Sequence, residues 1–165
     1  MDLYILRHGK AGKRGTMDWE DDRKRPLTAK GEKEMEEIAR WIVASGIEPD
    51  WIATSPLTRA RETAEIVANA LGITGRLEEW EELAVGQDPD AVLKKLSARR
   101  ADTRGMVVGH EPLLSRTMAM LISSDVSARI VLVKGGLAKI GEIRFDPVPS
   151  GELEWLVTPK CMVRS

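Results

Sequence analysis

Cysteine and histidine are scarce in this chain of 165 residues, which has one cysteine, Cys161, and two histidines, His8 and His110. A single cysteine excludes an intrachain disulfide and fits a reducing compartment such as the cytoplasm. These three residues are the usual side chains that bind zinc, and they are too few and too far apart to match a zinc-binding spacing. No motif indicates another metal or an organic cofactor, so we expect none.

A charge excess and long apolar runs are also absent. The 25 basic and 26 acidic residues leave a net charge of -1, so no global field favours nucleic acid or an anionic membrane as a partner. No apolar run approaches the roughly 18 residues of a membrane span. The first ten residues include Asp2 and Arg7 and lack the layout of a signal peptide. We therefore expect a cytoplasmic protein with no nucleic-acid or membrane partner.

Short apolar segments alternate with amphipathic ones along the chain. Apolar stretches predict strands at 2–7, 50–55 and 105–110, and two or three more in the last third. Helical spacing of apolar residues predicts helices at 29–45, 56–71 and 88–100 and from 112 onward. Such alternation implies parallel strands with right-handed crossovers. We predict an α/β fold, a three-layer α/β/α sandwich with a mostly parallel central sheet, formed by one domain over 1–165.

Local signals mark the ends and faces of these helices. Thr28 is a suitable N-cap for the helix at 29–45, whose apolar stripe is predicted to contain Met35, Ile38, Ile42 and Val43. Ser55 and Pro56 predict the start of the next helix, with serine as the N-cap and proline in the first helical position.

Residues with chemical potential follow the predicted strands. Arg7 and His8 come after the first, Ser55 after the second and His110 after the strand at 105–109. Because the carboxyl ends of parallel strands form the ligand-binding edge of such a sheet, we expect these residues on one rim. Arg59, in the first predicted turn of the helix from 56, belongs to the same rim.

Two arginines, two imidazoles and two helix N-termini at one rim predict an anion site. A phosphoryl group suits this set, because a guanidinium donates parallel hydrogen bonds to phosphate oxygens. A neutral imidazole can also attack phosphorus and form a phosphohistidine that water then hydrolyses. Gly9 would let the backbone turn beneath the phosphate. Taken singly, such histidines are usually core or solvated residues and such arginines surface charges; their coincidence favours the pocket.

Three segments resemble the motifs of the histidine phosphatase superfamily, also called the phosphoglycerate mutase-like group: LRHG at 6–9, SPLTRARETA at 55–64 and VVGHEP at 107–112. The short length and further segments resemble its SixA-type phosphohistidine phosphatases: RPLTAKG, ELAVGQDPDAVLKKL, KGGLAKI and LEWLVTP. The resemblance implies that His8 is the phosphorylated nucleophile and that Arg7, Arg59 and His110 complete the phosphate pocket. It also implies the fold predicted above.

The resemblance also implies secondary roles. Ser55 and Arg25 would lie close to the phosphate as substrate-binding residues. Larger members of the superfamily carry an acidic proton donor, for which Glu82 is the nearest match, although a solvated acidic stretch is the other interpretation. A phosphohistidine leaves as an imidazole, whose conjugate acid has a pKa near roughly 6.5, so it needs less help from a donor than an alkoxide does.

The leading hypothesis for function is therefore a phosphatase for phosphohistidine on a protein, such as a histidine phosphotransfer domain. The short chain leaves little to close over a small substrate, so we expect a shallow pocket. Its basic loop, with Lys10, Lys13 and Arg14, could dock an acidic partner or be merely solvated. The alternatives are a phosphatase for small phosphomonoesters that uses His8 in the same way and a catalytically silent phosphate-binding module. A mutase is disfavoured, and the oligomeric state stays open.

Overall fold

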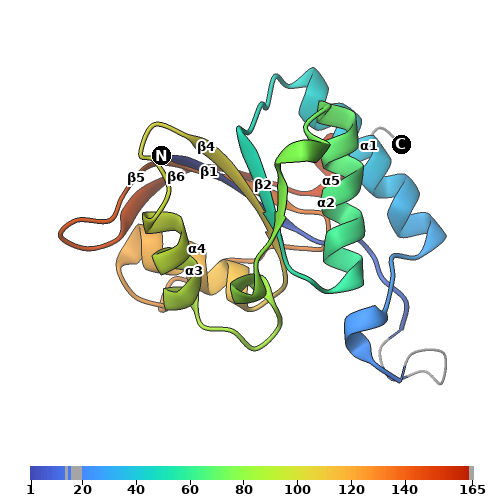
Figure 1. Cartoon of the computed structure of the whole chain (residues 1–165), viewed down its shortest axis with the longest axis horizontal. Helices are drawn as coiled ribbons and strands as arrows, with labels where there is room; N and C mark the ends of the chain where they lie inside the picture. Colours follow the sequence, from blue (N-terminus) through green and yellow to red (C-terminus); the bar gives the residue numbers. More distant parts are fainter. Residues whose placement is uncertain (14, 16–19, 164–165) are drawn as a thin grey trace.

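A computed structural model describes residues 1–13, 15 and 20–163 of the chain. At its centre lies a six-stranded sheet with the strand order β3-β2-β4-β1-β5-β6 (Figure 1). The strands are β1 (Asp2–Arg7), β2 (Trp51–Thr54), β3 (Leu77–Glu79), β4 (Arg104–Gly109), β5 (Leu137–Arg144) and β6 (Ser150–Val157). Strands β1 to β4 are parallel, whereas β5 is antiparallel to β1 and β6 is antiparallel to β5.

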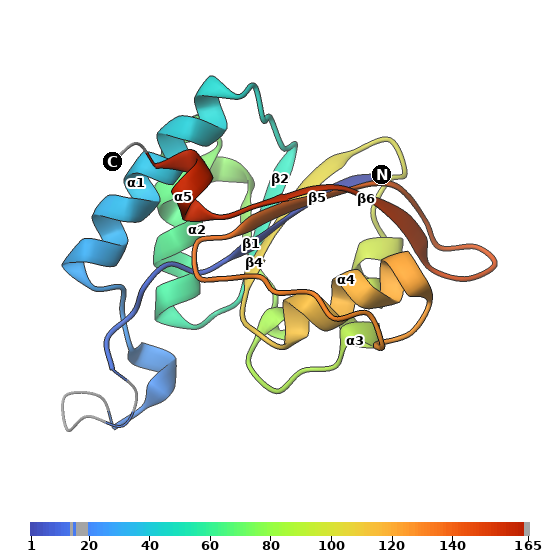
Figure 2. The ribbon, with the colours of Figure 1, turned by 180° about the vertical axis from the view of Figure 1, so that it is seen from behind.

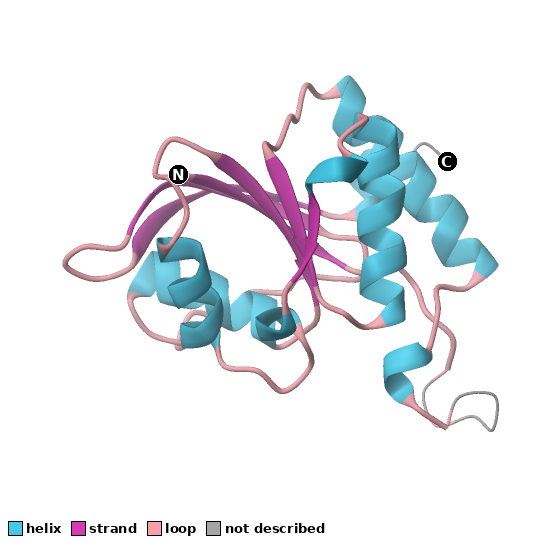
Figure 3. Ribbon diagram, viewed as in Figure 1, coloured by secondary structure: helices cyan, strands magenta, loops and turns pink. Residues whose placement is uncertain are grey.

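Helices cover both faces of this sheet (Figure 3). The longer helices are α1 (Ala29–Ala44), α2 (Thr58–Leu71), α3 (Pro89–Ser97) and α4 (Leu113–Ser123). Helices α1 and α2 lie on one face together with the short α5 (Pro159–Met162), which packs beside α1 (Figure 2). Helices α3 and α4 lie on the other face. The predicted three-layer α/β/α sandwich is confirmed. Within the described ranges, no helix is both long and apolar enough to span a membrane.

The side chains of β1 show how the two layers divide the core. Leu3 and Ile5 pack into the cluster beneath α3 and α4, whereas Tyr4 and Leu6 pack into the cluster beneath α1 and α2. Successive strand residues point to opposite faces of a sheet, so a strand covered on both faces must be apolar throughout. The apolar run that precedes Arg7 therefore anchors the end of β1 in both halves of the core.

Most of the predicted helix signals are confirmed. The hydroxyl of Thr28 accepts a hydrogen bond from the Gly31 N–H at 3.0 Å and caps α1. Gly72 ends α2 with a φ of 70°, a left-handed conformation that glycine adopts without steric cost. The prediction for Val43 is wrong, because its side chain is 47% exposed. It follows the buried Ile42 by one residue, and a helix turns neighbouring side chains about 100° apart.

The predicted start of α2 is also wrong. The helix begins at Thr58, with Leu57 as an N-cap that supplies no side-chain hydrogen bond. The Ser55 hydroxyl instead accepts a hydrogen bond from the Leu57 N–H at 3.2 Å, so it stabilises a turn before the helix. The last third of the chain was expected to contain two or three strands, and it contains two, β5 and β6. Residues 128–134, which precede β5, form neither helix nor strand.

Candidate active site

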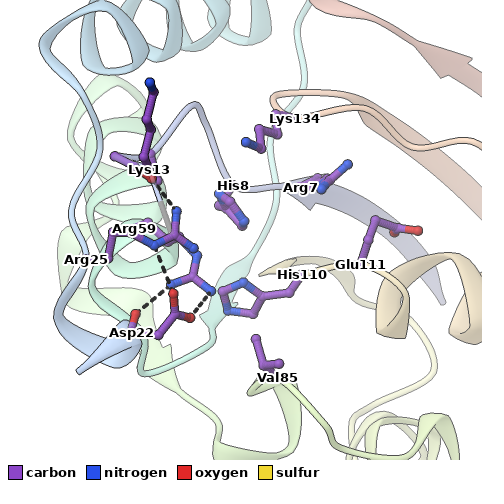
Figure 4. Close-up of a pocket in the computed structure, with 12 residues that line it drawn as sticks. Arg7, His8, Lys13, Asp22, Arg25, Arg59, Val85, His110, Glu111 and Lys134 are labelled. Atoms are coloured by element: carbon purple, nitrogen blue, oxygen red, sulfur yellow. Dashed lines mark hydrogen bonds and ion pairs between the residues drawn. The ribbon is translucent and has the colours of Figure 1, made fainter. Parts of the chain in front are cut away.

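The carboxyl ends of β1, β2 and β4 meet at one rim of the sheet, as predicted. The backbone N–H of His8 donates to the Gly109 carbonyl at 3.1 Å, and that of Ser55 donates to the Val108 carbonyl at 2.9 Å. A cavity of about 410 Å³ opens at this rim. It is lined by Arg7, His8, Ala11, Gly12, Lys13, Asp22, Arg25, Arg59, Val85, His110, Glu111 and Lys134 (Figure 4).

His8 has its two ring nitrogens in different settings. Nδ1 lies 2.7 Å from the Gly9 carbonyl oxygen. Because a carbonyl oxygen only accepts hydrogen bonds, Nδ1 carries the proton and Nε2 keeps its lone pair. The residue is 5% exposed, and burial lowers the pKa of His8 to about 3, with Arg59 and Arg7 acting in the same direction. His8 is therefore neutral near pH 7, the form in which an imidazole is a nucleophile.

Gly9 is needed for a reason that was not predicted. It is not among the glycines with positive φ, so no left-handed turn requires it. A Cβ at this position would lie 2.6 Å from Cγ of Met35, inside the buried face of α1. Its N–H donates to the Thr63 hydroxyl at 3.1 Å. Gly9 lets the chain after His8 pass closely over two helices; this packing role stands beside the predicted turn beneath the phosphate, which stays a prediction.

His110 faces His8 across the rim, with ring centroids 5.0 Å apart. Its Nε2 lies 2.8 Å from the Ser55 hydroxyl oxygen. Its Nδ1 is buried and has no hydrogen-bond partner among the described residues. Burial lowers the pKa of His110 to about 2, with a further contribution from the neighbouring His8. Ser55 thus lies behind His110 and does not line the cavity, so its predicted contact with substrate gives way to a contact with His110.

Arg7 occupies one side of His8 (Figure 4). Its Nη1 donates to the Leu132 carbonyl at 2.9 Å, while its buried Nε has no partner among the described residues. Burial lowers the pKa of Arg7 from its usual value. A guanidinium is basic enough to stay charged near neutral pH in spite of this shift.

Arg59 and Arg25 share a carboxylate on the opposite side. Nη1 of Arg59 donates to the Asp22 backbone carbonyl at 2.9 Å, and its Nη2 lies 3.2 Å from Oδ2 of Asp22. Nε of Arg25 lies 2.9 Å from Oδ1 of Asp22, and its Nη1 donates to the Gly12 carbonyl at 2.7 Å. Arg59 is only 3% exposed, and a buried guanidinium needs such partners. The pairing orients both arginines toward the cavity.

Asp22 and Lys134 are among the cavity residues that were missed from the sequence. Asp22 lies on the short 3-10 helix Asp22–Lys24, and its spacing of three from Arg25 was the only signal available. Lys134 precedes β5. Because β5 runs antiparallel to β1, the residues before β5 reach the same rim as those after β1. The KGG segment would have been placed there had the direction of β5 been predicted.

The remaining predicted residues, Glu82 and those of the basic loop, differ in their position relative to the cavity. Glu82 is not among the lining residues; its Oε1 lies 3.3 Å from Nζ of Lys95. In the basic loop, Lys13 lines the cavity, whereas Lys10 pairs with Glu34 at 2.9 Å. Arg14 lies outside the described residues. Among those that are described, no group of three histidine, cysteine or acidic side chains is arranged to hold a metal ion.

These features define a class of site: two neutral imidazoles and several guanidinium and ammonium groups around a small cavity, an arrangement suited to phosphoryl chemistry. Residues 3–88 match the family description "histidine phosphatase superfamily (branch 1)". The chain belongs to the histidine phosphatase superfamily, and this membership supports phosphatase activity.

Particular relatives narrow the comparison. The chain is 33% identical to an uncharacterized protein of Picosynechococcus sp. over 99% of both chains. It is 27% identical to the phosphohistidine phosphatase SixA of Escherichia coli, over 96% of this chain and 94% of the relative. The solved structure of the protein histidine phosphatase SixA with tungstate superposes with a TM-score of 0.84, at 26% identity, over 98% and 99% of the two chains.

The same fold also occurs in a phosphatase for a small molecule. The alpha-ribazole phosphatase from Shigella flexneri superposes with a TM-score of 0.76, covering 100% of this chain and 99% of that one. The two sequences are 16% identical, so this comparison shows a common fold alone.

Proposed function

We propose that this protein is a phosphohistidine phosphatase that acts on a phosphorylated protein, such as a histidine phosphotransfer domain, through a phospho-His8 intermediate. The observation that carries the proposal is the hydrogen bond between Nδ1 of His8 and the Gly9 carbonyl. It leaves Nε2 unprotonated beside Arg7 and Arg59, in a cavity that fits a phosphoryl group and the side chain that carries it. The proposal includes a cytoplasmic location, a reducing environment that fits the single thiol of Cys161.

The first step transfers the phosphoryl group to His8. Nε2 attacks phosphorus in line, a new P–N bond forms, and the P–N bond to the substrate imidazole breaks. The electron pair of that bond leaves on the substrate nitrogen, so the substrate histidine departs as a neutral imidazole if its other nitrogen is protonated. Arg7 and Arg59 stabilise the negative charge on the phosphoryl oxygens. The buried Nδ1 of His110 has no partner among the described residues and gains one by donating to such an oxygen, provided that Ser55 donates to Nε2.

The second step releases phosphate. Water attacks phosphorus, its oxygen forms the new P–O bond, and both of its protons leave with the phosphate, which is released as dihydrogen phosphate. The bond to Nε2 breaks, and its electron pair returns to Nε2. Because Nδ1 keeps its proton on the Gly9 carbonyl throughout, His8 leaves as a neutral imidazole. The same hydrogen bond therefore exposes the nucleophile and makes it a good leaving group, so no carboxylic acid is needed to protonate it.

Three observations support a protein-bound phosphohistidine as the substrate. SixA of Escherichia coli, which is 27% identical to this chain, is a phosphohistidine phosphatase, and the similar structure with tungstate is that of a protein histidine phosphatase. The predicted donor Glu82 is paired with Lys95 outside the cavity lining, which suits a substrate whose leaving group needs little protonation. Val85, at the cavity, is 48% exposed, so an apolar contact is available to a partner surface there.

A phosphatase for small phosphomonoesters is the second candidate. The specific observation in its favour is that two carboxylates, Asp22 and Glu111, line the cavity, and a carboxylic acid is a suitable proton donor to a departing alkoxide. The two functions differ in their need for an acid, because an alkoxide must be protonated as it leaves whereas an imidazole need not be.

The test compares kcat/KM on a phosphorylated histidine phosphotransfer domain with kcat/KM on a panel of phosphate esters. We expect a clear preference for the phosphoprotein. Glu82→Gln should retain activity on it, as should the control Glu81→Gln, which changes the neighbouring residue of the same 3-10 helix. A clear preference for esters would overturn the proposal, and loss of ester activity in Glu82→Gln but not in Glu81→Gln would in addition establish Glu82 as a proton donor.

A further inference from the structure

Lys134 lines the cavity together with Arg7, Arg25 and Arg59. It lies in the turn before β5, and Figure 4 places it with Arg7 on one side of His8. The pair formed by Arg59 and Asp22 lies on the other side (Figure 4). A phosphoryl group on His8 would therefore have a cation on each side.

The turn that carries Lys134 is tied to the backbone of the nucleophile. The Gly135 N–H lies 3.1 Å from the Arg7 carbonyl and 3.2 Å from that of His8, and the Arg7 N–H donates to the Gly136 carbonyl at 3.0 Å. Gly135 has a φ of 72°, which glycine adopts without the steric cost that a side chain brings. The position of the Lys134 backbone relative to His8 is thus fixed by hydrogen bonds and by a conformation that favours glycine.

The surroundings of the Lys134 ammonium are unfavourable to its charge. Burial lowers its pKa, and four cations add to the effect: Arg7, Arg25, Arg59 and Lys10. Within the described part of the chain, Lys134 makes no hydrogen bond or ion pair. Neighbouring cations are compensated: Arg25 and Arg59 share Asp22, and Lys10 pairs with Glu34. Lys134 therefore lowers the stability of the ligand-free protein, because its ammonium is repelled by these cations and no described carboxylate pairs with it.

We propose that Lys134 is a substrate-binding residue whose ammonium contacts a non-bridging oxygen of the phosphoryl group, both in the substrate and on His8. This inference rests on the proposed function, since it assigns a further ligand to the same phosphoryl group. A bound dianion turns the repulsion among Lys134, Arg7 and Arg59 into attraction toward a common centre. A lysine reaches such an oxygen as a point charge on a flexible stem, so the contact needs no fixed fork geometry.

Lys134→Met should lower the affinity for anions without lowering the thermal stability of the protein. Without ligand, the variant should unfold at the same or a higher temperature than the wild type, because it removes an uncompensated cation and keeps the apolar stem. Its affinity for inorganic phosphate and for tungstate should fall by about 10- to 100-fold, the range expected for a lost charge-assisted hydrogen bond. If Lys134 had only a structural role, Lys134→Met would unfold at a lower temperature than the wild type. The folded fraction of the variant would then bind the anions with wild-type affinity.

The experiment is a titration of inorganic phosphate and tungstate, by calorimetry, into four proteins. They are the wild type, Lys134→Met, Lys134→Arg and the control Lys33→Met, whose lysine is exposed on α1 away from the cavity. We expect weak binding only in Lys134→Met and recovery of most affinity in Lys134→Arg. Equal affinity in Lys134→Met and the wild type overturns the role of Lys134 and leaves the proposed function standing. No anion binding by the wild type contradicts the proposed function itself.

Discussion

Nε2 of His110 and the hydroxyl oxygen of Ser55 lie 2.8 Å apart, although 55 residues separate them in the chain. The same hydroxyl oxygen accepts a hydrogen bond from the Leu57 N–H, so its own proton is available to Nε2 of His110. If Ser55 donates this proton, His110 carries its proton on Nδ1. Ser55 then acts on the reaction through the tautomer of His110, without touching the substrate.

Removing this hydroxyl should reduce catalysis and stability together. We expect Ser55→Ala to lower kcat about tenfold, because the tautomer of His110 is no longer fixed, with a small effect on KM. The unfolding free energy should fall by about 1–3 kcal/mol, since a buried ring nitrogen loses its partner. Kinetics and urea unfolding measure the two effects, with the exposed Ser97→Ala as control. A wild-type kcat in Ser55→Ala would show that Ser55 does not act on catalysis through His110.

Asp22 should weaken the binding of anions in the cavity. Its carboxylate lies at the cavity and pairs with Arg59 and Arg25. It therefore repels a bound phosphate, although it also orients the two arginines that bind the phosphate. We expect Asp22→Asn to bind inorganic phosphate roughly three- to tenfold more tightly, because one negative charge is removed from the site. Calorimetric titration beside Asp90→Asn, an exposed position on α3, measures this. Weaker binding in Asp22→Asn would mean that orientation of the arginines outweighs repulsion.

The two imidazoles should make stability depend on pH. Burial lowers the pKa of His8 to about 3, so the folded protein binds fewer protons than the unfolded chain between pH 6.5 and 3. The contribution of neutral His8 to stability is therefore complete above pH 6.5 and is lost as the pH falls toward 3. Relative to His8→Gln, the wild type should lose up to about 1.4 kcal/mol more per pH unit in this window. Urea unfolding at several pH values measures the difference, and parallel curves would refute it.

Gly9 tests the packing beneath the nucleophile. Its Cβ would meet Cγ of Met35 at 2.6 Å, so Gly9→Ala should destabilise the protein by about 1–3 kcal/mol through overpacking. Met35→Ala in the same chain should remove much of this extra cost, a coupling that a double-mutant cycle detects. Gly75→Ala is the control, because nothing lies within 4 Å of its Cβ position. Strict additivity of the two changes would exclude the contact as the reason for Gly9.

The rim residues could be predicted because local signals place them. An apolar strand must end somewhere, and parallel topology brings the ends that carry His8 and His110 to one edge of the sheet. Asp22 and Lys134 could not be placed in the same way. Asp22 reaches the site on a short 3-10 helix that contacts Arg59 of α2, and Lys134 reaches it ahead of an antiparallel strand whose direction has no local signature. Ser55 was predicted as the N-cap of α2 because serine before proline is typical of that position, and this local pattern carries no sign of the contact with His110.

The most direct test of the account is to trap the intermediate. The protein is exposed briefly to a histidine phosphotransfer domain that carries labelled phosphohistidine, quenched in base and digested. We predict a base-stable, acid-labile label on the peptide that contains His8, with none in His8→Ala, which should also lose turnover. Full turnover by His8→Ala, or a label on His110 in place of His8, would contradict the assignment of His8 as the nucleophile.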